Sequence, residues 1–266
     1  STNYGQYLAT DLEEAVGEEA DALRESISDL LVDAVTLTQE LINNLKTVDE
    51  PTNEEQRELY TLMLNRGLIL RLLGEVSEDG TFYLEQASST LENLAGVAGD
   101  DSTHGLRAYM ELGRVLVSMG DPCTAVDFFS FVVDRIMPRN YEDWDRVKEV
   151  ASQAELDQRW LYVEMVVADL IGAAMICGNT DEAVGWGLHF YNMRQREGFE
   201  LNALGNLGFL ALARALDAGG WVGGRAADGG LAWYGTLEEA SDAGHSKRNR
   251  QTAMDLALAV AQDVNR

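Results

Sequence analysis

Apolar residues recur at helical spacing along almost the whole chain. Residues 7–45 contain one glycine and no proline, and between Val16 and Leu41 apolar residues fall at alternating intervals of four and three positions. This alternation predicts a long amphipathic helical segment, either one helix or two helices broken near Ser26. Its apolar stripe has the spacing of a coiled-coil seam. The residues of this stripe, called the seam below, are Val16, Leu23, Ile27, Leu30, Leu37 and Leu41.

Two interpretations of the N-terminal segment, residues 1–50, stay open. In one, the apolar stripe packs on the rest of the chain and covers one end of a helical domain. In the other, it is the contact between copies of a homo-oligomer. The segment is the first of three regions that we expect in the chain, followed by residues 51–217 and 218–266.

The second region contains further helices with clear boundaries. Thr52 and Glu55 have the spacing of a capping box, so a helix should begin after Thr52 and continue to about Leu73, where Gly74 is expected to stop it. Residues 75–80 are polar and predict a turn. Residues 81–94 predict another helix, and residues 141–154 predict an inserted amphipathic one.

Residues 104–138 carry the most specific pattern in the chain. A helix with a small residue among its apolar positions is followed by Gly120-Asp121-Pro122, which supplies a helix-ending glycine, an N-cap and a first-turn proline. A second helix then runs to Pro138. The residues that carry the pattern are Tyr109, Leu112, Gly113, Gly120, Ala125, Phe129 and Pro138.

This pattern resembles the tetratricopeptide repeat (TPR), a helix pair of about 34 residues. A weaker copy covers residues 167–193, and looser starts lie near Gly67 and Gly208. The spacing of the copies is uneven, so the resemblance implies an all-α fold made of an irregular, TPR-like stack of helix pairs. In such folds the first helix of each pair lines a groove for a partner. Carried over by position, the groove residues are Arg71, Met110, Arg114, Val117 and Met175.

The third region, residues 218–266, departs from helical patterning at its start. Residues 219–235 hold seven glycines around Trp221 and Trp233, a density that a packed helix does not tolerate. We expect a long loop without strands, followed by C-terminal helices.

The composition indicates the solution conditions in which the protein works and disfavours one class of partner. The formal net charge is -25, and of the 20 basic residues only Lys46, Lys148 and Lys247 are lysines. Acidic residues recur in nearly every segment, a composition that resembles haloarchaeal proteins, which work in concentrated salt where charge repulsion is screened. The alternative is an acidic protein that binds a basic partner, which predicts clustered acidic residues instead of spread ones. Nucleic acid is disfavoured as a partner because binding to phosphates requires a positive surface.

Targeting signals and chemical motifs are scarce. Cys123 and Cys177 are interpreted as reduced, buried thiols, and no run is apolar enough for membrane insertion, so we expect a cytoplasmic protein. No metal-ligand spacing, cofactor motif or nucleophile motif is present, so we expect neither a metal nor a cofactor.

Three functions remain open from the sequence. We favour a non-enzymatic protein-interaction module that binds a protein or peptide in a TPR-like groove. A structural homo-oligomer built on the seam is the first alternative. A helical enzyme or ligand-binding protein, with a pocket under the glycine- and tryptophan-rich loop near Trp221 and Arg225, is the second.

Overall fold

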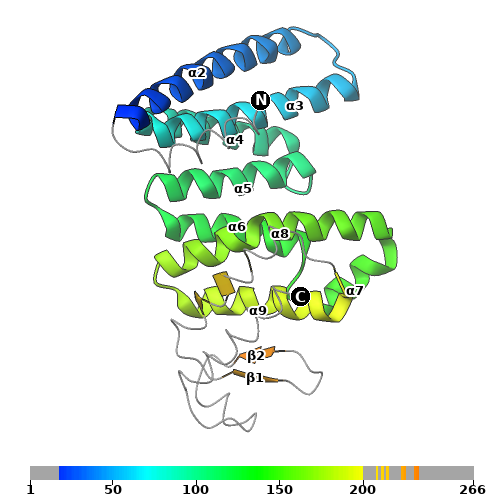
Figure 1. Ribbon diagram of the computed structural model, residues 1–266. Coiled ribbons are helices and arrows are strands. Elements are labelled where there is room, and N and C mark those ends of the chain that lie inside the picture. The colour runs from blue at the N-terminus through cyan, green and yellow to red at the C-terminus, as the bar shows by residue number, and fades with distance from the viewer. Residues whose placement is uncertain are drawn as a thin grey trace. The chain divides into compact units, whose positions relative to one another are not determined.

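The computed structural model describes residues 18–199, positions 208, 211, 212, 214 and 215, and two short strands, 223–225 and 231–233. Apart from those strands the described residues are mainly helical (Figure 1), so the expected all-α class is confirmed. The chain divides into two compact units, residues 1–121 and 122–266. This boundary falls within the expected second region, between the two helices of the most specific TPR-like pattern.

The first unit contains four described helices. They are α2 (Glu18–Lys46), α3 (Asn53–Val76), α4 (Gly80–Ala98) and α5 (Thr103–Ser118). Each helix packs on the next, and α3 also contacts α5 directly. Short connections join the helices, so successive ones run antiparallel (Figure 1). Contact between α3 and α5 is the relationship expected of the first helices of two stacked helix pairs.

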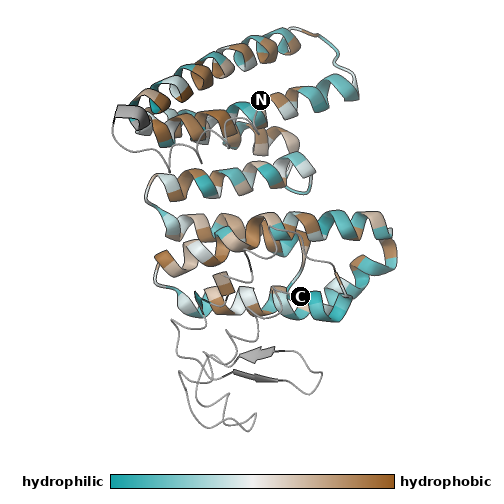
Figure 2. Ribbon diagram, in the orientation of Figure 1, coloured by the Kyte–Doolittle hydropathy of each residue, from teal (hydrophilic) through white to brown (hydrophobic). Residues whose placement is uncertain are grey.

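Helix α2 is continuous through Ser26, so the alternative of two shorter helices is wrong for this part of the segment. Its apolar and polar residues alternate along its length (Figure 2). Ile27 and Leu31 pack against Ile69 and Leu73 of α3 and form an aliphatic core cluster. The amphipathic pattern therefore positions α2 on α3 by burial of apolar surface.

The start of α3 agrees with the prediction, and its end does not. The Thr52 backbone N–H donates to Glu55 Oε2 at 2.7 Å, and Glu55 N–H donates to Thr52 Oγ1 at 3.2 Å, which completes the capping box. Gly74 does not stop the helix, which continues to Val76. A Cβ at this position would lie 2.7 Å from Leu84 Cγ, so Gly74 permits close packing of α3 on α4.

The second unit contains α6 (Pro122–Ile136), α7 (Tyr141–Val150), α8 (Gln153–Ile176) and α9 (Thr180–Glu197). Helix α8 packs on both α6 and α9. The predicted helix over residues 141–154 ends earlier, at Val150. It ends there because Ser152 and Glu155 form a second capping box that begins α8.

The turns after α5 and α8 share one geometry. Gly120 and Gly178 both have positive φ, 84° and 81°. Asp121 N–H donates to the Leu116 carbonyl at 2.8 Å, and Asn179 N–H donates to the Ala174 carbonyl, also at 2.8 Å. Both are Schellman motifs, in which glycine is favoured because it adopts the left-handed conformation without strain. The weaker TPR-like copy thus ends its first helix in the same way as the stronger one.

Two strands in the glycine-rich segment correct the expectation of a loop without strands. Strand β1 (Gly223–Arg225) pairs antiparallel with β2 (Leu231–Trp233), and β2 lies against α9. The sequence pattern missed these strands because three residues are too few to show the alternation on which strand prediction depends. The helices expected after Thr236, and a pocket under this segment, lie outside the described residues.

Candidate interaction surface

One face of the first unit is formed by charged and hydroxyl side chains on α3 and α5. The polar side chains on α5 follow one another at intervals of three and four residues, so they lie in one stripe along the helix. The corresponding α3 stripe includes Arg57, Thr61, Arg71 and Glu75, and the α5 stripe consists of His104, Arg107, Glu111, Arg114 and Ser118. We call these two stripes together the α3–α5 face.

Three polar contacts join the two stripes. Thr61 Oγ1 lies 3.1 Å from His104 Nε2, and Arg71 Nε donates to Glu111 Oε2 at 3.3 Å. Ser118 Oγ donates to Glu75 Oε1 at 2.7 Å. The contact between α2 and α3, by contrast, is aliphatic. The α3–α5 contact is therefore held in register by hydrogen bonds and ion pairs rather than by apolar burial alone.

Glu111 is the most buried charged group of this face. Only 3% of its side chain is exposed, and it pairs with both Arg71 and Arg114. Arg71 also pairs with Glu75 at 2.6 Å. Two carboxylates and two guanidinium groups thus form one network, in which each buried charge has a partner as burial requires.

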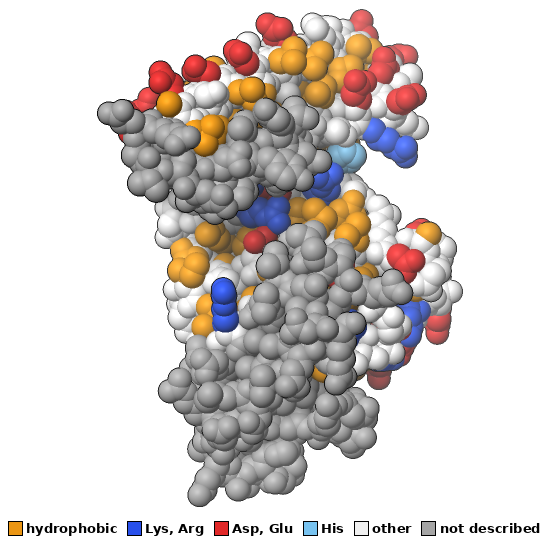
Figure 3. All heavy atoms as spheres, in the orientation of Figure 1, with side chains coloured by type: hydrophobic (Ala, Val, Ile, Leu, Met, Phe, Trp, Pro, Cys, Tyr) orange, Lys and Arg blue, Asp and Glu red, His pale blue; other side chains and the backbone are white. Residues whose placement is uncertain are grey.

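The other end of the face carries positive charge without a local counterion. Burial lowers the pKa of His104, and the positive charges of Arg107 and Arg57 lower it further. No described acidic side chain forms an ion pair with Arg57 or Arg107, and the buried Arg107 Nε has no hydrogen-bond partner. On the face shown in Figure 3, Lys or Arg side chains gather with a histidine beside apolar side chains, and Asp and Glu side chains lie mostly along the outer edge, with some acidic surface adjoining the basic side chains.

The predicted groove residues divide between the two units. Arg71 and Arg114 come together on Glu111, Met110 is buried in α5 and Val117 is half-buried. Met175 is half-buried in α8, in the second unit. Sequence reasoning missed Arg57, Thr61, His104, Arg107 and Glu111. The spacing of charged residues along α5 was a usable signal, whereas their pairing with α3 was not visible in the sequence.

The seam residues are also divided. Leu23 and Ile27 pack on the aliphatic cluster beneath α2, and Val16 lies outside the described residues. The other three remain at the surface, with exposed fractions of 43%, 57% and 42% for Leu30, Leu37 and Leu41. The broad apolar face of α2 is thus half covered by α3 and half exposed.

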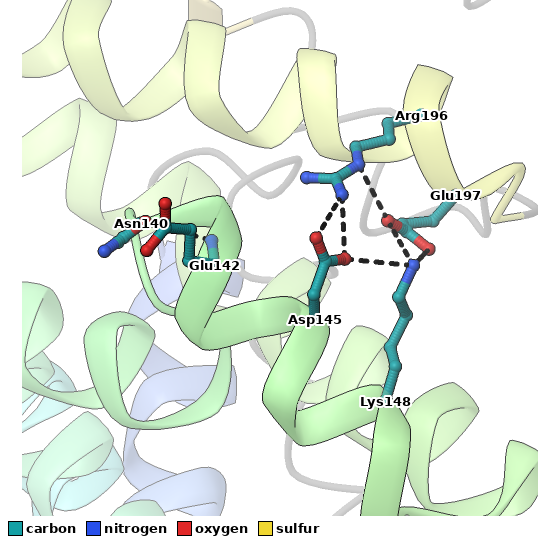
Figure 4. Close-up of polar contacts among 6 residues, drawn as sticks. All are labelled: Asn140, Glu142, Asp145, Lys148, Arg196 and Glu197. Atoms are coloured by element: carbon teal, nitrogen blue, oxygen red, sulfur yellow. Dashed lines mark hydrogen bonds and ion pairs between the residues drawn. The ribbon is translucent and has the colours of Figure 1, made fainter.

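In the second unit, an ion network joins α7 to the end of α9 (Figure 4). Arg196 Nη2 donates to both oxygens of Asp145, at 2.7 and 2.8 Å. Lys148 Nζ lies 2.8 Å from Glu197 Oε2 and 3.4 Å from Asp145 Oδ1. Figure 4 also shows Asn140, whose side chain caps the first turn of α7 by accepting from the Glu142 N–H at 2.9 Å. These contacts hold the short, mostly polar α7 in place.

A histidine lies in the aromatic part of the second unit. Burial and the positive charge of Arg139 lower the pKa of His189 to about 4, although its hydrogen bonds to the carbonyls of Met137 and Pro138 act in the opposite direction. The Arg139 guanidinium stacks over the buried Trp186 ring, 3.5 Å from its centroid. The imidazole is therefore neutral at physiological pH.

Cys123 and Cys177 form a disulfide, so the interpretation as free, buried thiols is wrong. Cys123 is exposed in the first turn of α6, and Cys177 is the C-cap of α8. The two helices pack along each other with the start of one beside the end of the other, which brings the Cα atoms to 5.1 Å. The residues are 54 positions apart, so this proximity depends on tertiary packing that the sequence pattern does not specify.

Neither a membrane-spanning helix nor a metal-ligand cluster occurs among the described residues. None of their helices combines the length and the apolar character needed to cross a bilayer. No group of three or more described His, Cys, Asp or Glu side chains converges as metal ligands would.

No protein-family model matches this chain, and no curated protein is significantly similar to it in sequence. Two crystal structures of nearly identical TPR-like repeats, from a Podosopora anserina protein named as a kinesin light chain, are similar in fold. The first, a point variant, has a TM-score of 0.47 at 15% identity and covers 98% of each chain. The second has a TM-score of 0.42 at 14% identity, over 90% of this chain and 98% of the other. Because both TM-scores are below 0.5, nothing is inferred from these structures. The described helices are assigned to a TPR-like, irregular helix-pair fold from the helix contacts and turns given above.

Proposed function

We propose that this protein is a non-enzymatic interaction module that binds a protein or peptide partner on the α3–α5 face. The observation that carries the proposal is the polar character of this face. Thr61 and Ser118 are exposed at its two ends, and four arginines lie between or beside them. A face with only a packing role would be filled by aliphatic side chains, as between α2 and α3.

Arginine suits such a surface in the salt-rich setting that the composition suggests. The guanidinium group stays charged and binds carboxylates through two parallel hydrogen bonds, which operate at contact distance. Long-range attraction, in contrast, is screened over about 3 Å in molar salt. We propose the cytoplasm of a halophilic cell as the setting on the composition alone, because the Cys123–Cys177 disulfide removes reduced thiols as a ground for it. Nucleic acid and a membrane are not the proposed partners.

Site-specific photo-crosslinking tests the proposal. A benzophenone amino acid replaces Val117, which is half-buried on α5 and adjacent in sequence to Ser118 of the α3–α5 face, and, as a control, the exposed Ser89 on α4. Irradiation in native, high-salt extract is expected to give one discrete heterologous adduct from position 117 and none from position 89. Equal labelling from both positions, or no adduct from position 117, would contradict the proposal.

A homo-oligomer is a second candidate, and the exposed half of the α2 seam favours it. Leu30, Leu37 and Leu41 follow at intervals of seven and four residues and together present an uncovered apolar stripe. Light scattering on the purified protein in molar salt should give at least a dimer mass. Leu37→Glu should convert it to a monomer with unchanged helix content. A monomeric wild-type protein would rule this candidate out.

A further inference from the structure

The cationic charges of the α3–α5 face are distributed unevenly along it. At one end, Arg71 and Arg114 are neutralised by Glu75 and Glu111. At the other end, Thr61, one turn after Arg57 on α3, lies 3.1 Å from His104 Nε2 through its Oγ1. Arg107 follows His104 by one turn on α5. Arg57, His104 and Arg107 therefore lie near one another, and both arginines lower the pKa of the histidine. We call these three residues the cationic cluster.

No described acidic side chain compensates the cationic cluster. Glu54 and Glu58 are near Arg57 in the sequence, but neither forms an ion pair with it. Asp100 is engaged elsewhere, because Tyr109 donates a hydrogen bond to its Oδ1 at 2.8 Å. Although the chain has 45 acidic and 20 basic residues, neither arginine of this cluster forms an ion pair with a described carboxylate.

The surroundings of the cluster favour an anionic group at contact distance. Tyr60 packs edge-on against His104, with ring centroids 5.7 Å apart, and its hydroxyl donates to the Val97 carbonyl at 2.9 Å. These contacts hold the Tyr60 ring of α3 in place against α4 and α5. His104 and Arg107 lie at the start of the 16-residue helix α5, where the helix dipole also favours negative charge.

We propose that the cationic cluster is a docking subsite for an acidic protein segment, whose Asp or Glu side chains pair with Arg57 and Arg107. This inference rests on the proposed function and specifies the chemistry of the partner. A carboxylate-bearing segment fits better than a nucleic acid, because a long polyanion would also meet the repulsion of a chain with net charge -25. A short acidic segment needs only the local positive charge.

Fluorescence anisotropy with three labelled peptides tests the partner chemistry. The first is a short peptide rich in Asp and Glu, the second replaces these residues with Asn and Gln, and the third carries phosphoserine in a neutral background. Binding is measured at the lowest salt concentration at which the protein is fully folded by circular dichroism. The acidic peptide is expected to bind at least about tenfold more tightly than the amide peptide. Equal binding of these two, or binding of the phosphopeptide alone, would overturn the inference.

Variants test the location. Arg57→Gln combined with Arg107→Gln should weaken binding of the acidic peptide by roughly tenfold or more. Arg24→Gln is the matched control, since Arg24 is exposed on α2 and pairs with Asp21, and it should leave binding within about twofold. Each variant is used only after its circular dichroism spectrum and melting temperature match the wild type. If the double variant is folded and binds like the wild type, the inference fails.

The two proposals fail in distinguishable ways. An adduct at position 117 together with unchanged peptide binding by the double Gln variant would retain the interaction module and remove the acidic subsite. Loss of peptide binding in that variant without any adduct at position 117 would retain the anion-binding cluster and remove the broader function.

Discussion

Arg71 of α3 and Glu111 of α5 form an ion pair across the helix contact, with Nε and Oε2 3.3 Å apart. Arg71 is largely shielded from solvent and Glu111 almost completely so, and Arg114 completes the coordination of the carboxylate. The register of the α3–α5 face depends on this pair, because a shift of either helix by one residue would separate the charges.

Removal of the carboxylate should be costly. Glu111→Gln leaves two partly buried guanidinium groups without their counterion and is expected to lower the free energy of unfolding by about 3 kcal/mol. Glu85→Gln, on the exposed surface of α4, is the control and should change it by less than about 0.5 kcal/mol. Denaturant titration of both variants in the same salt checks this. Equal stability of the two variants would show that Glu111 is not engaged as described.

Two glycines should respond in opposite directions to substitution by alanine. A Cβ at Gly67 would lie 2.5 Å from Leu91 Cδ2, whereas nothing lies within 4 Å of one at Gly96. Gly67→Ala is therefore expected to cost about 1 to 3 kcal/mol through overpacking. Gly96→Ala should stabilise α4 by about 0.5 to 1 kcal/mol through its higher helix propensity. Thermal denaturation compares them, and two shifts of the same sign would contradict the close contact of α3 with α4.

The buried imidazole of His189 should make stability depend on pH. Its pKa is lowered to about 4 in the folded state, against an ordinary value of 6.5 for histidine. As the pH decreases, His189 is therefore protonated in the unfolded chain before it is protonated in the folded chain. The free energy of unfolding should fall as the pH decreases from about 6.5 to about 4 and then level off. The loss attributable to this group is about 3 kcal/mol, since each pKa unit corresponds to about 1.4 kcal/mol.

His189→Gln supplies the comparison for that pH dependence. The many carboxylates of the chain also titrate in acid, so the informative quantity is the difference in unfolding free energy between wild type and variant at each pH. That difference should decline between pH values of about 6.5 and 4. A difference that stays constant over this range would mean that the folded and unfolded pKa values of His189 are equal.

Reduction should destabilise the second unit. The Cys123–Cys177 disulfide closes a loop with a sequence separation of 54 residues, for which chain entropy gives about 4 kcal/mol. Mass spectrometry of the protein purified without reductant should find no free thiol. Reductant should then lower the melting temperature of the wild type and leave that of the Cys123→Ser, Cys177→Ser double variant unchanged. Free thiols in the purified protein would contradict the pairing.

Local signals predicted the helices and turns well. The capping box of Thr52 and Glu55, and the glycines at 120 and 178, act within one turn of chain, so their spacing alone indicates the geometry. The start of α8 carried the same kind of signal in Ser152 and Glu155 and was predictable in principle. Helix ends that depend on tertiary packing were less accessible, as the continuation of α3 beyond Gly74 shows.

The candidate surface was only partly predictable. Position in the TPR-like pattern identified Arg71 and Arg114 but gave no indication that both pair with Glu111, 40 residues from Arg71 in the sequence. The proximity of Thr61 and His104, 43 residues apart, and the disulfide also arise from helix packing. A single sequence specifies which side of each helix is polar, and tertiary structure decides which polar sides meet.

Amide hydrogen exchange of the protein, together with the partner that photo-crosslinking identifies, tests the central proposal most directly. Exchange is measured with and without the partner, in the salt concentration at which the protein is fully folded. Binding on the α3–α5 face predicts slower exchange in peptides from Asn53–Val76 and Thr103–Ser118, with little change in Glu18–Lys46. Protection confined to Glu18–Lys46 or to the second unit, with the exchange of α3 and α5 unaltered, would contradict it.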